Sequence, residues 1–311
     1  MAEATSTTVH IEGRRLTLTN LGKLMYPEAS FTKGEVIDYY ARIAPVMLAH
    51  LGDRCVTFVR YPDGVQGKSF FEKRCPGHRP DWVRTALGRG DRRARTAADR
   101  SGTGGIDYCV LSDVPSIVWA ANLAAIEMHT PMARAAKMDI PTMAVFDLDP
   151  GAPAAMRECA EVALHLREAL GSLDLELFPK TSGSKGLQVY LPLNADHDRD
   201  HVRSFALAVA QLMEKQHPNL VLTTMAKDLR VGKVFIDWSQ NAVFKTTVCA
   251  YSLRARSRPT VSTPVTWEEV EAAADGAPLS FEAPTVIERV AGMGDLFAPA
   301  ATLVQHLPPA A

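Results

Sequence analysis

The chain has 311 residues, of which 47% are hydrophobic and 22% are charged, with a formal net charge of -1. This length suits one large domain or two smaller ones with a sizeable core, and the composition is that of a globular protein. No apolar run reaches the ~20 residues that a membrane helix needs, and the balanced charge is not that of a generally basic nucleic-acid binder.

The chain ends and the cysteines carry further expectations. The first eight residues are polar and lack the basic and apolar parts of a secretion signal, so we expect a cytoplasmic protein without membrane contact and with a disordered tail over residues 1–8. Five scattered cysteines argue against a disulfide framework. Cys75-Pro76-Gly77-His78 is a weak candidate for a metal knuckle, and loop residues without a metal are the alternative.

Hydrophobic periodicity and capping signals predict mixed helices and strands along the chain. In chain order these are a hairpin over residues 10–18, a short segment capped by Asn20 and ended by Pro27, a helix from the Thr32 and Glu35 capping box to His50, strands over 55–60 and 106–111, a helix from Pro115 to His129, a strand over 143–148, a helix over 154–170, strands over 175–178 and 187–193, a helix over 201–216 and a strand over 234–238. This order indicates an α/β or α+β sheet covered by helices. The segment 261–311, rich in Ala and Pro, is expected to be peripheral.

A basic segment lies between the two early strands. It holds seven arginines and three aspartates between Arg79 and Arg100, bracketed by glycines. A basic hairpin of this kind would suit the phosphate backbone of a nucleic acid. A merely solvated loop is the alternative.

Three aspartates lie inside apolar strand sequence. Asp147 and Asp149 are two residues apart and therefore project from one face of their strand, while Asp237 ends a later strand. Ionised carboxylates so placed repel each other unless a cation lies between them, and a hard divalent ion is the best candidate. Three carboxylates suit a two-metal phosphoryl-transfer site. An Asx-type turn before Pro150 is the alternative for the first pair.

Other polar residues suit a nucleotide. The segment Thr181-Ser-Gly-Ser-Lys-Gly186 can fold its backbone N–H groups around an anion, although it is not a Walker loop and an ordinary hairpin turn would also fit. Cations that flank the third aspartate could join a triphosphate site or be surface charge; they are Arg230, Lys233, Lys245, Arg254, Arg256 and Arg258. His129 at a predicted helix end could contact phosphate or pack in the core. Phe70 and Phe71 could stack on bases or anchor a loop.

Taken together, several motifs between Leu16 and Arg256 resemble the polymerase domain of bacterial ligase D, a member of the archaeo-eukaryotic primase superfamily. They are Thr19-Asn-Leu-Gly-Lys23 with Tyr26-Pro27, Phe70-Phe-Glu-Lys73, Phe146-Asp-Leu-Asp-Pro-Gly151, Thr181 to Gly186, and Val234-Phe-Ile-Asp-Trp-Ser-Gln-Asn241. The resemblance implies an α+β fold with an RRM-like catalytic sheet, surrounding helices and an N-terminal subdomain. It also implies template-directed addition of nucleotides, often ribonucleotides.

The resemblance assigns roles by position. Asp147, Asp149 and Asp237 are expected to bind two Mn²⁺ or Mg²⁺ ions. Nucleotide contacts are expected from His129, Ser182, Ser184, Lys185, Arg230, Lys245 and Arg254. Asn20, Lys23 and Lys33 resemble a pocket for the 5′-phosphate of a DNA gap, where lysine acts as a point charge, and Phe70 and Phe71 resemble a template-stacking pair.

We therefore expect a primase-polymerase catalytic domain over 9–260, with a DNA-binding part over 9–135 and a metal and nucleotide core over 136–260. No ligase signature Lys-x-Asp-Gly is present, since Lys137-Met-Asp-Ile140 lacks the glycine, so we expect an enzyme that fills short 5′-phosphorylated gaps or broken ends. The expected partners are such DNA, NTPs or dNTPs, a separate DNA ligase and Ku. Two alternatives stay open: a haloacid dehalogenase-type phosphatase, which uses a strand-borne Asp-x-Asp nucleophile, and a catalytically silent DNA-end binding module.

Overall fold

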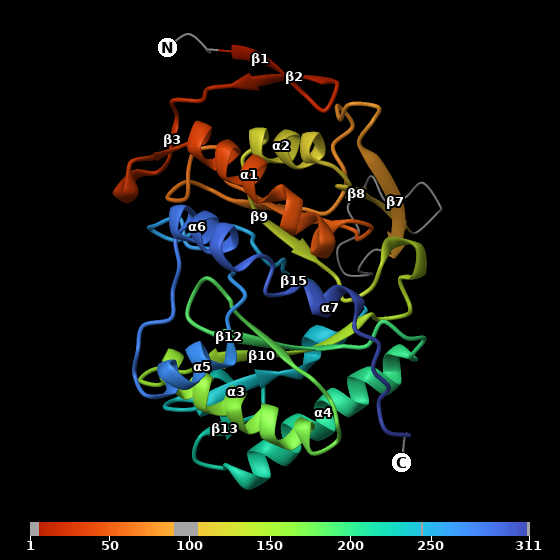
Figure 1. The fold of residues 1–311 in the computed structure, drawn as a ribbon, viewed down its shortest axis with the longest axis vertical. Coiled ribbons are helices and arrows are strands. Elements are labelled where there is room, and N and C mark those ends of the chain that lie inside the picture. Colours follow the sequence, from red (N-terminus) through yellow and green to blue (C-terminus); the bar gives the residue numbers. More distant parts are fainter. Residues whose placement is uncertain (1–5, 90–104, 244, 310–311) are drawn as a thin grey trace.

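The computed structural model describes residues 6–89, 105–243 and 245–309. Its two halves are stacked along the long axis, and the N-terminal and C-terminal ends lie at opposite ends of that axis (Figure 1). Residues 90–100 of the basic segment predicted between Arg79 and Arg100 lie outside the described residues, whereas residues 84–89 form one strand of a hairpin. The predicted α+β class is confirmed by this mixture of helices and largely antiparallel sheets.

The N-terminal half is a four-stranded sheet covered by two helices and flanked by three hairpins. The sheet has the order β15-β9-β5-β6, and α1 begins at the predicted capping box, in which the Thr32 side chain accepts a hydrogen bond from the Glu35 amide. The elements are β1 (Ser6–Ile11), β2 (Arg14–Thr19), β3 (Leu24–Tyr26), η1 (Pro27–Ala29), β4 (Phe31–Thr32), α1 (Lys33–Leu51), β5 (Thr57–Arg60), β6 (Phe70–Glu72), β7 (Arg84–Arg89), β8 (Gly105–Val110), α2 (Val114–Asn122), β9 (Ala125–Thr130) and β15 (Thr247–Val248).

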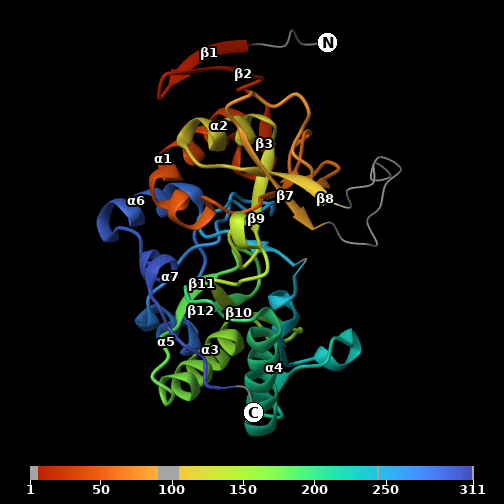
Figure 2. The same cartoon turned by 90° about the vertical axis from the view of Figure 1, so that its right-hand side faces the viewer.

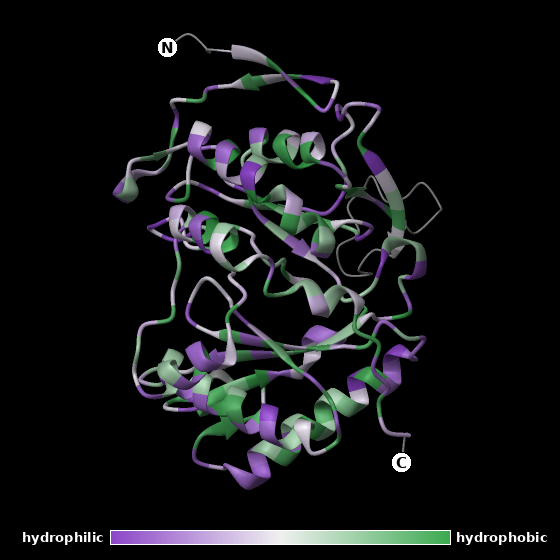
Figure 3. Ribbon diagram, viewed as in Figure 1, coloured by the Kyte–Doolittle hydropathy of each residue, from purple (hydrophilic) through white to green (hydrophobic). Residues whose placement is uncertain are grey.

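The C-terminal half is a five-stranded sheet of order β11-β12-β10-β14-β13, with α3 and α4 packed against one face. Apolar colouring follows its strands, while the helices carry polar residues outside (Figure 3). The elements are η4 (Ala135–Lys137), β10 (Met143–Pro150), α3 (Met156–Gly171), β11 (Phe178–Thr181), β12 (Leu187–Pro192), α4 (Arg199–Gln216), β13 (Val221–Leu222), η5 (Lys227–Arg230), β14 (Val234–Asp237), η6 (Trp238–Asn241) and α5 (Trp267–Ala274). The last two helices, α6 (Ala283–Met293) and α7 (Ala298–Thr302), supply core residues to the N-terminal half.

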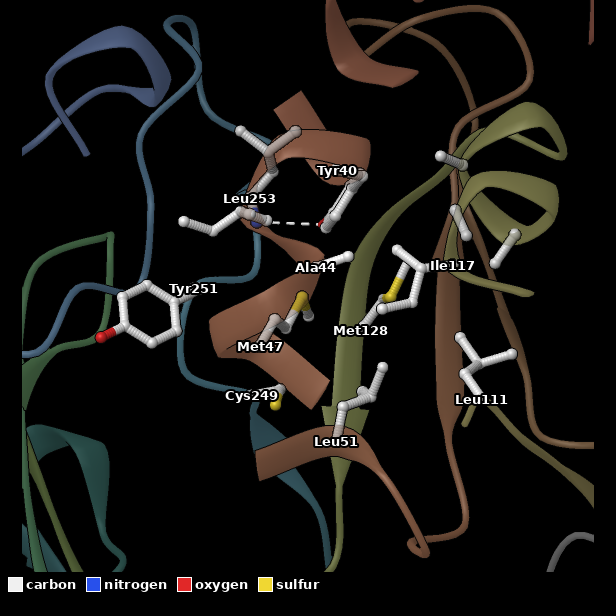
Figure 4. Close-up of a cluster of buried hydrophobic side chains, with 14 of the residues drawn as sticks. Tyr40, Ala44, Met47, Leu51, Leu111, Ile117, Met128, Cys249, Tyr251 and Leu253 are labelled. Atoms are coloured by element: carbon white, nitrogen blue, oxygen red, sulfur yellow. Dashed lines mark hydrogen bonds between the residues drawn. The ribbon is translucent and has the colours of Figure 1, made fainter. Parts of the chain in front are cut away.

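Two hydrophobic clusters correspond to these halves. We call the cluster of the N-terminal half the upper cluster and that of the C-terminal half the lower cluster. In the upper cluster, α1 supplies Tyr40, Ala44, Met47 and Leu51, which meet Met128 of β9 (Figure 4). The Tyr40 hydroxyl accepts a hydrogen bond of 3.1 Å from the Leu253 amide, the contact drawn in Figure 4. The chain around Leu253 is therefore built into the core of the N-terminal half.

The last fifty residues are more deeply packed than their composition suggested. Val261, Val286 and Phe297 belong to the upper cluster, while Val270 and Leu307 belong to the lower one. The helix α5 packs on α3, whereas α6 and α7 lie beside α1 (Figure 1). This segment joins the two halves instead of lying at the periphery.

Four local predictions are wrong. Residues 6–8, predicted as part of a disordered tail, belong to β1, whereas residues 1–5 lie outside the described chain. The segment after Asn20 is not a helix ended by Pro27: it forms β3, and Pro27 begins a 3-10 helix. The helix from Pro115 stops at Asn122, and residues 125–130 form β9 because Ala124 turns the chain with a positive φ of 59°. The strand predicted over 175–178 begins only at Phe178.

The cysteines hold one disulfide, between Cys75 and Cys109, whose Cα atoms are 4.8 Å apart. This bond ties the loop before β7 to β8, so the expectation of no disulfide fails at this place. The metal knuckle at Cys75 is excluded as well, because its sulfur is already bonded. Among the described residues, no helix is both long and apolar enough to span a bilayer.

Candidate active site

A row of polar residues crosses four neighbouring strands of the five-stranded sheet. Lys180 of β11 lies opposite Gln188 of β12, Gln188 lies opposite Asp147 of β10, and Asp147 lies opposite Asp237 of β14. Residues directly opposite in antiparallel strands project from the same face. The four side chains therefore form one polar line across a sheet whose other residues are largely apolar.

The alternation along β10 decides which way this line faces. Ala144, Phe146 and Leu148 are fully buried in the lower cluster against α3 and α4, whereas Val145 packs in the upper cluster. Asp147 and Asp149 continue the Val145 face because side chains alternate along a strand. The carboxylates thus point away from the covering helices and toward the N-terminal half, at the junction that Figure 2 shows between β10 and β9.

The three carboxylates are poorly compensated by cations. Burial, together with the charges of Asp149 and Asp237, raises the pKa of Asp147 to about 7, and burial with Asp237 raises the pKa of Asp149. Asp147 Oδ1 accepts one hydrogen bond of 2.9 Å from Gln188 Nε2. Asp237 Oδ1 accepts hydrogen bonds from the Ser239 amide and hydroxyl, and its Oδ2 accepts one from Gln240 at 2.8 Å. Mutual repulsion of this kind is what a divalent ion would relieve.

The donor set fits a hard divalent ion, since three carboxylates share one face of the sheet. Within the described ranges, however, no three His, Cys, Asp or Glu side chains converge closely enough to hold a metal ion as they stand. Asp237 is turned toward Ser239 and Gln240, so it would have to rotate to bind an ion with Asp147 and Asp149. Carboxylates that repel one another are expected to point apart when no cation draws them together.

The loop between β11 and β12 folds beside the aspartate strand. Ser182 Oγ accepts hydrogen bonds of 3.2 Å from the amides of Ser184 and Gly186, and the Ser182 amide donates to the Gly186 carbonyl at 2.9 Å. A Cβ atom at Gly186 would lie 2.1 Å from the carbonyl oxygen of Leu148, between the two aspartates. Only glycine allows this approach. The segment is therefore a hairpin turn held directly against β10. Lys185 is exposed on this turn.

A buried carboxylate that the sequence reading missed joins two of the predicted nucleotide contacts. Glu127 Oε2 is 2.8 Å from His129 Nε2, and its Oε1 accepts hydrogen bonds from Arg254 Nε at 3.1 Å and from the Ala255 amide at 3.0 Å. Arg254 in turn donates to the Ser182 carbonyl at 2.7 Å. Burial raises the pKa of Glu127, but its donors His129 and Arg254 outweigh burial and lower it to about 2. Glu127, His129 and Arg254 (the Glu127 group) are thus connected to the Ser182 loop.

The other two predicted nucleotide contacts are placed differently. The Arg230 guanidinium lies 3.9 Å above the centre of the Phe235 ring, and Phe235 lies opposite Asp149, so Arg230 is beside the aspartates. Its charge lowers the pKa of Asp149, against the effect of burial. Lys245 is exposed and lines a small pocket with Cys55 and Tyr108. Within the described part of the chain, no contact brings Lys245 to the carboxylates.

The three residues of the predicted 5′-phosphate pocket lie together at the N-terminus of α1. The Asn20 carbonyl accepts from the Lys23 amide at 2.9 Å, and the Lys23 carbonyl accepts from the Lys33 amide at 2.8 Å. Lys23 Nζ forms a 2.8 Å ion pair with Asp63, while Lys33 Nζ donates to the Thr19 carbonyl at 2.7 Å. Burial, with Lys23 and Arg60 nearby, lowers the pKa of Lys33 to about 8. Two crowded cations at a helix N-terminus favour an anion.

Both aromatic residues predicted to stack on a template are exposed. Phe71 is 66% exposed and Phe70 43% exposed, on the edge strand β6. The Phe71 ring lies 6.2 Å from the His129 ring, and Arg60 lies 5.0 Å above the Phe70 ring. Exposed rings, one of them beside the Arg60 cation, are suited to bases and phosphates, and Phe71 adjoins the Glu127 group through His129.

Comparison with known proteins agrees with this geometry. A family model described as LigD, primase-polymerase domain, matches residues 32–297. The multifunctional non-homologous end joining DNA repair protein LigD of Mycobacterium tuberculosis is 41% identical over 291 residues, 91% of this chain and 36% of that protein. The bifunctional non-homologous end joining protein LigD of Bacillus subtilis is 30% identical over 281 residues, 90% of this chain and 43% of that protein. The chain thus spans well under half the length of these relatives.

A solved structure extends the match to the whole fold. The polymerase domain from Mycobacterium tuberculosis ligase D, in complex with DNA, superposes with a TM-score of 0.84 at 38% identity and covers 94% of this chain and 99% of that chain. The family model covers most of the sequence and includes all three aspartates, the Ser182 loop and Glu127. The chain therefore belongs to the LigD primase-polymerase domain family.

Proposed function

We propose that this protein is a template-dependent nucleotidyltransferase of bacterial DNA repair that extends a primer across short gaps or broken ends carrying a 5′-phosphate. The observation that supports this most strongly is the placement of three carboxylates on one sheet face beside the Ser182 loop and the Glu127 group. A DNA complex of the related polymerase domain supports DNA as the partner. The family assignment leaves a dehalogenase-type phosphatase without support.

Each group in the site has a task in this proposal. Asp147, Asp149 and Asp237 would hold two divalent ions, which neutralise the triphosphate and activate the primer hydroxyl when bound. The Ser182 loop and Lys185 would bind the triphosphate, Arg254 would position the loop through the Ser182 carbonyl, and Arg230 would approach from the β14 side. Positioning and charge neutralisation then supply most of the rate enhancement.

DNA would be bound across the N-terminal half. Lys23 and Lys33 would bind the 5′-phosphate at the downstream side of the gap, and Phe71 would stack on the template near His129. Lys23 is already neutralised by Asp63, so a phosphate would have to displace that carboxylate. Because the curated relatives are named for non-homologous end joining, a DNA ligase and Ku are proposed as partners, in the cytoplasm at the nucleoid.

Primer extension on short gapped DNA tests the proposal. The substrate is prepared with and without a 5′-phosphate, and Mn²⁺ or Mg²⁺ is combined with NTPs or dNTPs. Templated extension that the phosphate stimulates would support a gap-filling polymerase and would identify its sugar and metal preferences. Tight DNA binding without extension under any of these conditions would overturn the polymerase and support a DNA-end binding module.

A further inference from the structure

Lys180 is a lysine with 1% of its surface exposed, on β11 at the edge of the five-stranded sheet. Its Nζ donates three hydrogen bonds: to Gln188 Oε1 at 2.5 Å, to Ser262 Oγ at 2.6 Å and to the Val248 carbonyl at 3.0 Å. Burying an ammonium costs free energy even when it is hydrogen-bonded, and an apolar residue of similar volume would often be more stable there. A purely structural role does not explain why this costly group stands in the row that leads through Gln188 to Asp147 and Asp237.

The acceptors around Lys180 fix which way the Gln188 amide faces. Val248 offers only a carbonyl oxygen, and Ser262 Oγ already donates to the Thr181 carbonyl at 2.9 Å, so both must accept from the amine. Gln188 Oε1 also accepts a 3.3 Å hydrogen bond from the Tyr190 hydroxyl. With the amide oxygen held by two donors, the Gln188 NH₂ group must face Asp147 Oδ1.

This orientation matters because the amide is the hydrogen-bond donor that Asp147 receives from its neighbouring strand. If the amide were reversed, its oxygen would face the carboxylate and repel it. Gln188 thus engages Oδ1 of Asp147 from the β12 side, whereas Asp237 lies opposite Asp147 on the other side, in β14. Groups that orient a metal-binding carboxylate from behind typically contribute 10–100-fold to metal affinity.

We propose that Lys180 is a positioning residue that acts through Gln188 to hold Asp147 as an oriented carboxylate for divalent metal binding. The proposal rests on the assignment of Asp147 as a metal ligand in the proposed function. Lys180 touches neither the nucleotide loop side chains nor the DNA-facing residues in the described part of the chain. Its influence on activity should therefore appear as a changed requirement for metal, with DNA binding unchanged.

The experiment measures Mn²⁺ binding to the metal-free protein by electron paramagnetic resonance, together with primer extension as a function of Mn²⁺ concentration. Lys180→Met keeps the volume of the side chain and removes its donors. We expect its Kd for Mn²⁺ and its half-saturating Mn²⁺ concentration to rise by about 10-fold or more. Excess Mn²⁺ should restore much of the extension rate, which a fold defect would not allow.

Two further variants separate positioning from folding. Arg54 is an equally buried cation, 4% exposed, that donates to the Pro131 carbonyl and to Thr142 Oγ1. Arg54→Met should lower thermal stability without changing the Mn²⁺ affinity. If Lys180→Met does not fold, Gln188→Met tests the same link, because it leaves Lys180 bonded to Ser262 and Val248, and it should weaken Mn²⁺ binding to a similar degree.

The outcomes are distinguishable from those of the proposed function. An unchanged Mn²⁺ affinity in folded Lys180→Met or Gln188→Met protein, with Mn²⁺ binding lost in Asp147→Ala, would overturn the positioning role and leave the metal site intact. Mn²⁺ binding that survives Asp147→Ala would overturn both the metal site and the positioning role of Lys180. If Lys180→Met weakens Mn²⁺ binding but the unsubstituted protein extends no primer, the positioning role is supported and the polymerase assignment fails.

Discussion

Asp147 lies directly opposite Asp237 in the antiparallel pair of β10 and β14, and Asp149 follows two residues along the same face. Three carboxylates therefore occupy neighbouring positions on one face of the sheet. Their mutual repulsion lowers the stability of the metal-free protein at this site, a cost that is common where function sets the residue choice. Replacing these residues should therefore favour stability and harm activity.

The double variant Asp147→Ala with Asp149→Ala should abolish primer extension and leave DNA binding within about twofold. Its melting temperature without metal should not fall, because the substitution removes repulsion between carboxylates. Extension assays, fluorescence anisotropy with gapped DNA and thermal unfolding measure the three quantities. Glu161→Ala with Glu168→Ala, two exposed acids on α3, is the matched control and should extend normally. Extension retained by the Asp147 and Asp149 variant would refute the site.

Substitutions of Lys23 and of Asp63 should change the preference for a 5′-phosphorylated gap in opposite directions. Lys23→Ala removes a cation from the proposed phosphate pocket, so the preference for a gap bearing a 5′-phosphate should weaken by several-fold. Asp63→Asn removes the carboxylate that pairs with Lys23 at 2.8 Å and should strengthen the preference. Competition binding with phosphorylated and unphosphorylated gaps measures both, with Lys215→Ala on α4 as the control. Equal preference in all four proteins would show that the phosphate binds elsewhere.

The aspartate strand could be predicted from sequence because its signals are local. A period of two places Asp147 and Asp149 on one face, and the apolar residues before them define the strand. The helix predicted to His129 was wrong for an equally local reason. Residues 125–130 are almost entirely buried, so they show no alternation that marks a strand, and Ala124 makes the break with a positive φ although it is not glycine.

Lys180 and Glu127 could not be found by the same reasoning. Lys180 stands next to the recognised Ser182 loop, yet a lysine in a short strand is normally read as exposed. Its acceptors come from residues 188, 248 and 262, and the partners of Glu127 include residues 254 and 255. Such buried polar groups are defined by strand register and long-range packing, which sequence spacing does not determine.

Gly186→Ala should disturb both stability and activity, because the added Cβ would lie 2.1 Å from the Leu148 carbonyl between the two aspartates. Backbone atoms cannot move aside cheaply, so a loss of about 1–3 kcal/mol is expected, with slower extension from a displaced loop. Gly171→Ala at the end of α3 meets nothing within 4 Å and should be neutral or slightly stabilising. Urea unfolding and extension rates measure the difference, and equal behaviour of the two variants would contradict the close approach.

Glu127 should contribute stability that depends on pH. Its pKa is lowered in the fold to about 2 from an ordinary value of 4.5, mainly because the hydrogen bond from His129 and the charge of Arg254 outweigh the opposing effect of burial. A carboxyl whose folded pKa is depressed stabilises the protein above the unfolded pKa, and this contribution is lost as pH falls through the folded pKa. The difference corresponds to stabilisation on the order of 3 kcal/mol at neutral pH.

Glu127→Gln should therefore be less stable than the unsubstituted protein at pH 7, and the gap should narrow as pH falls from about 4.5 toward 2. Urea unfolding at a series of pH values measures this, with exposed Glu161→Gln as the control that should keep the parent slope. The groups facing Glu127 are His129 and Arg254. Burial lowers the pKa of His129, so protonation of that ring at acid pH adds to the same loss of stability. A stability gap that stays constant from pH 7 to 3 would show that Glu127 is not held ionised by these partners.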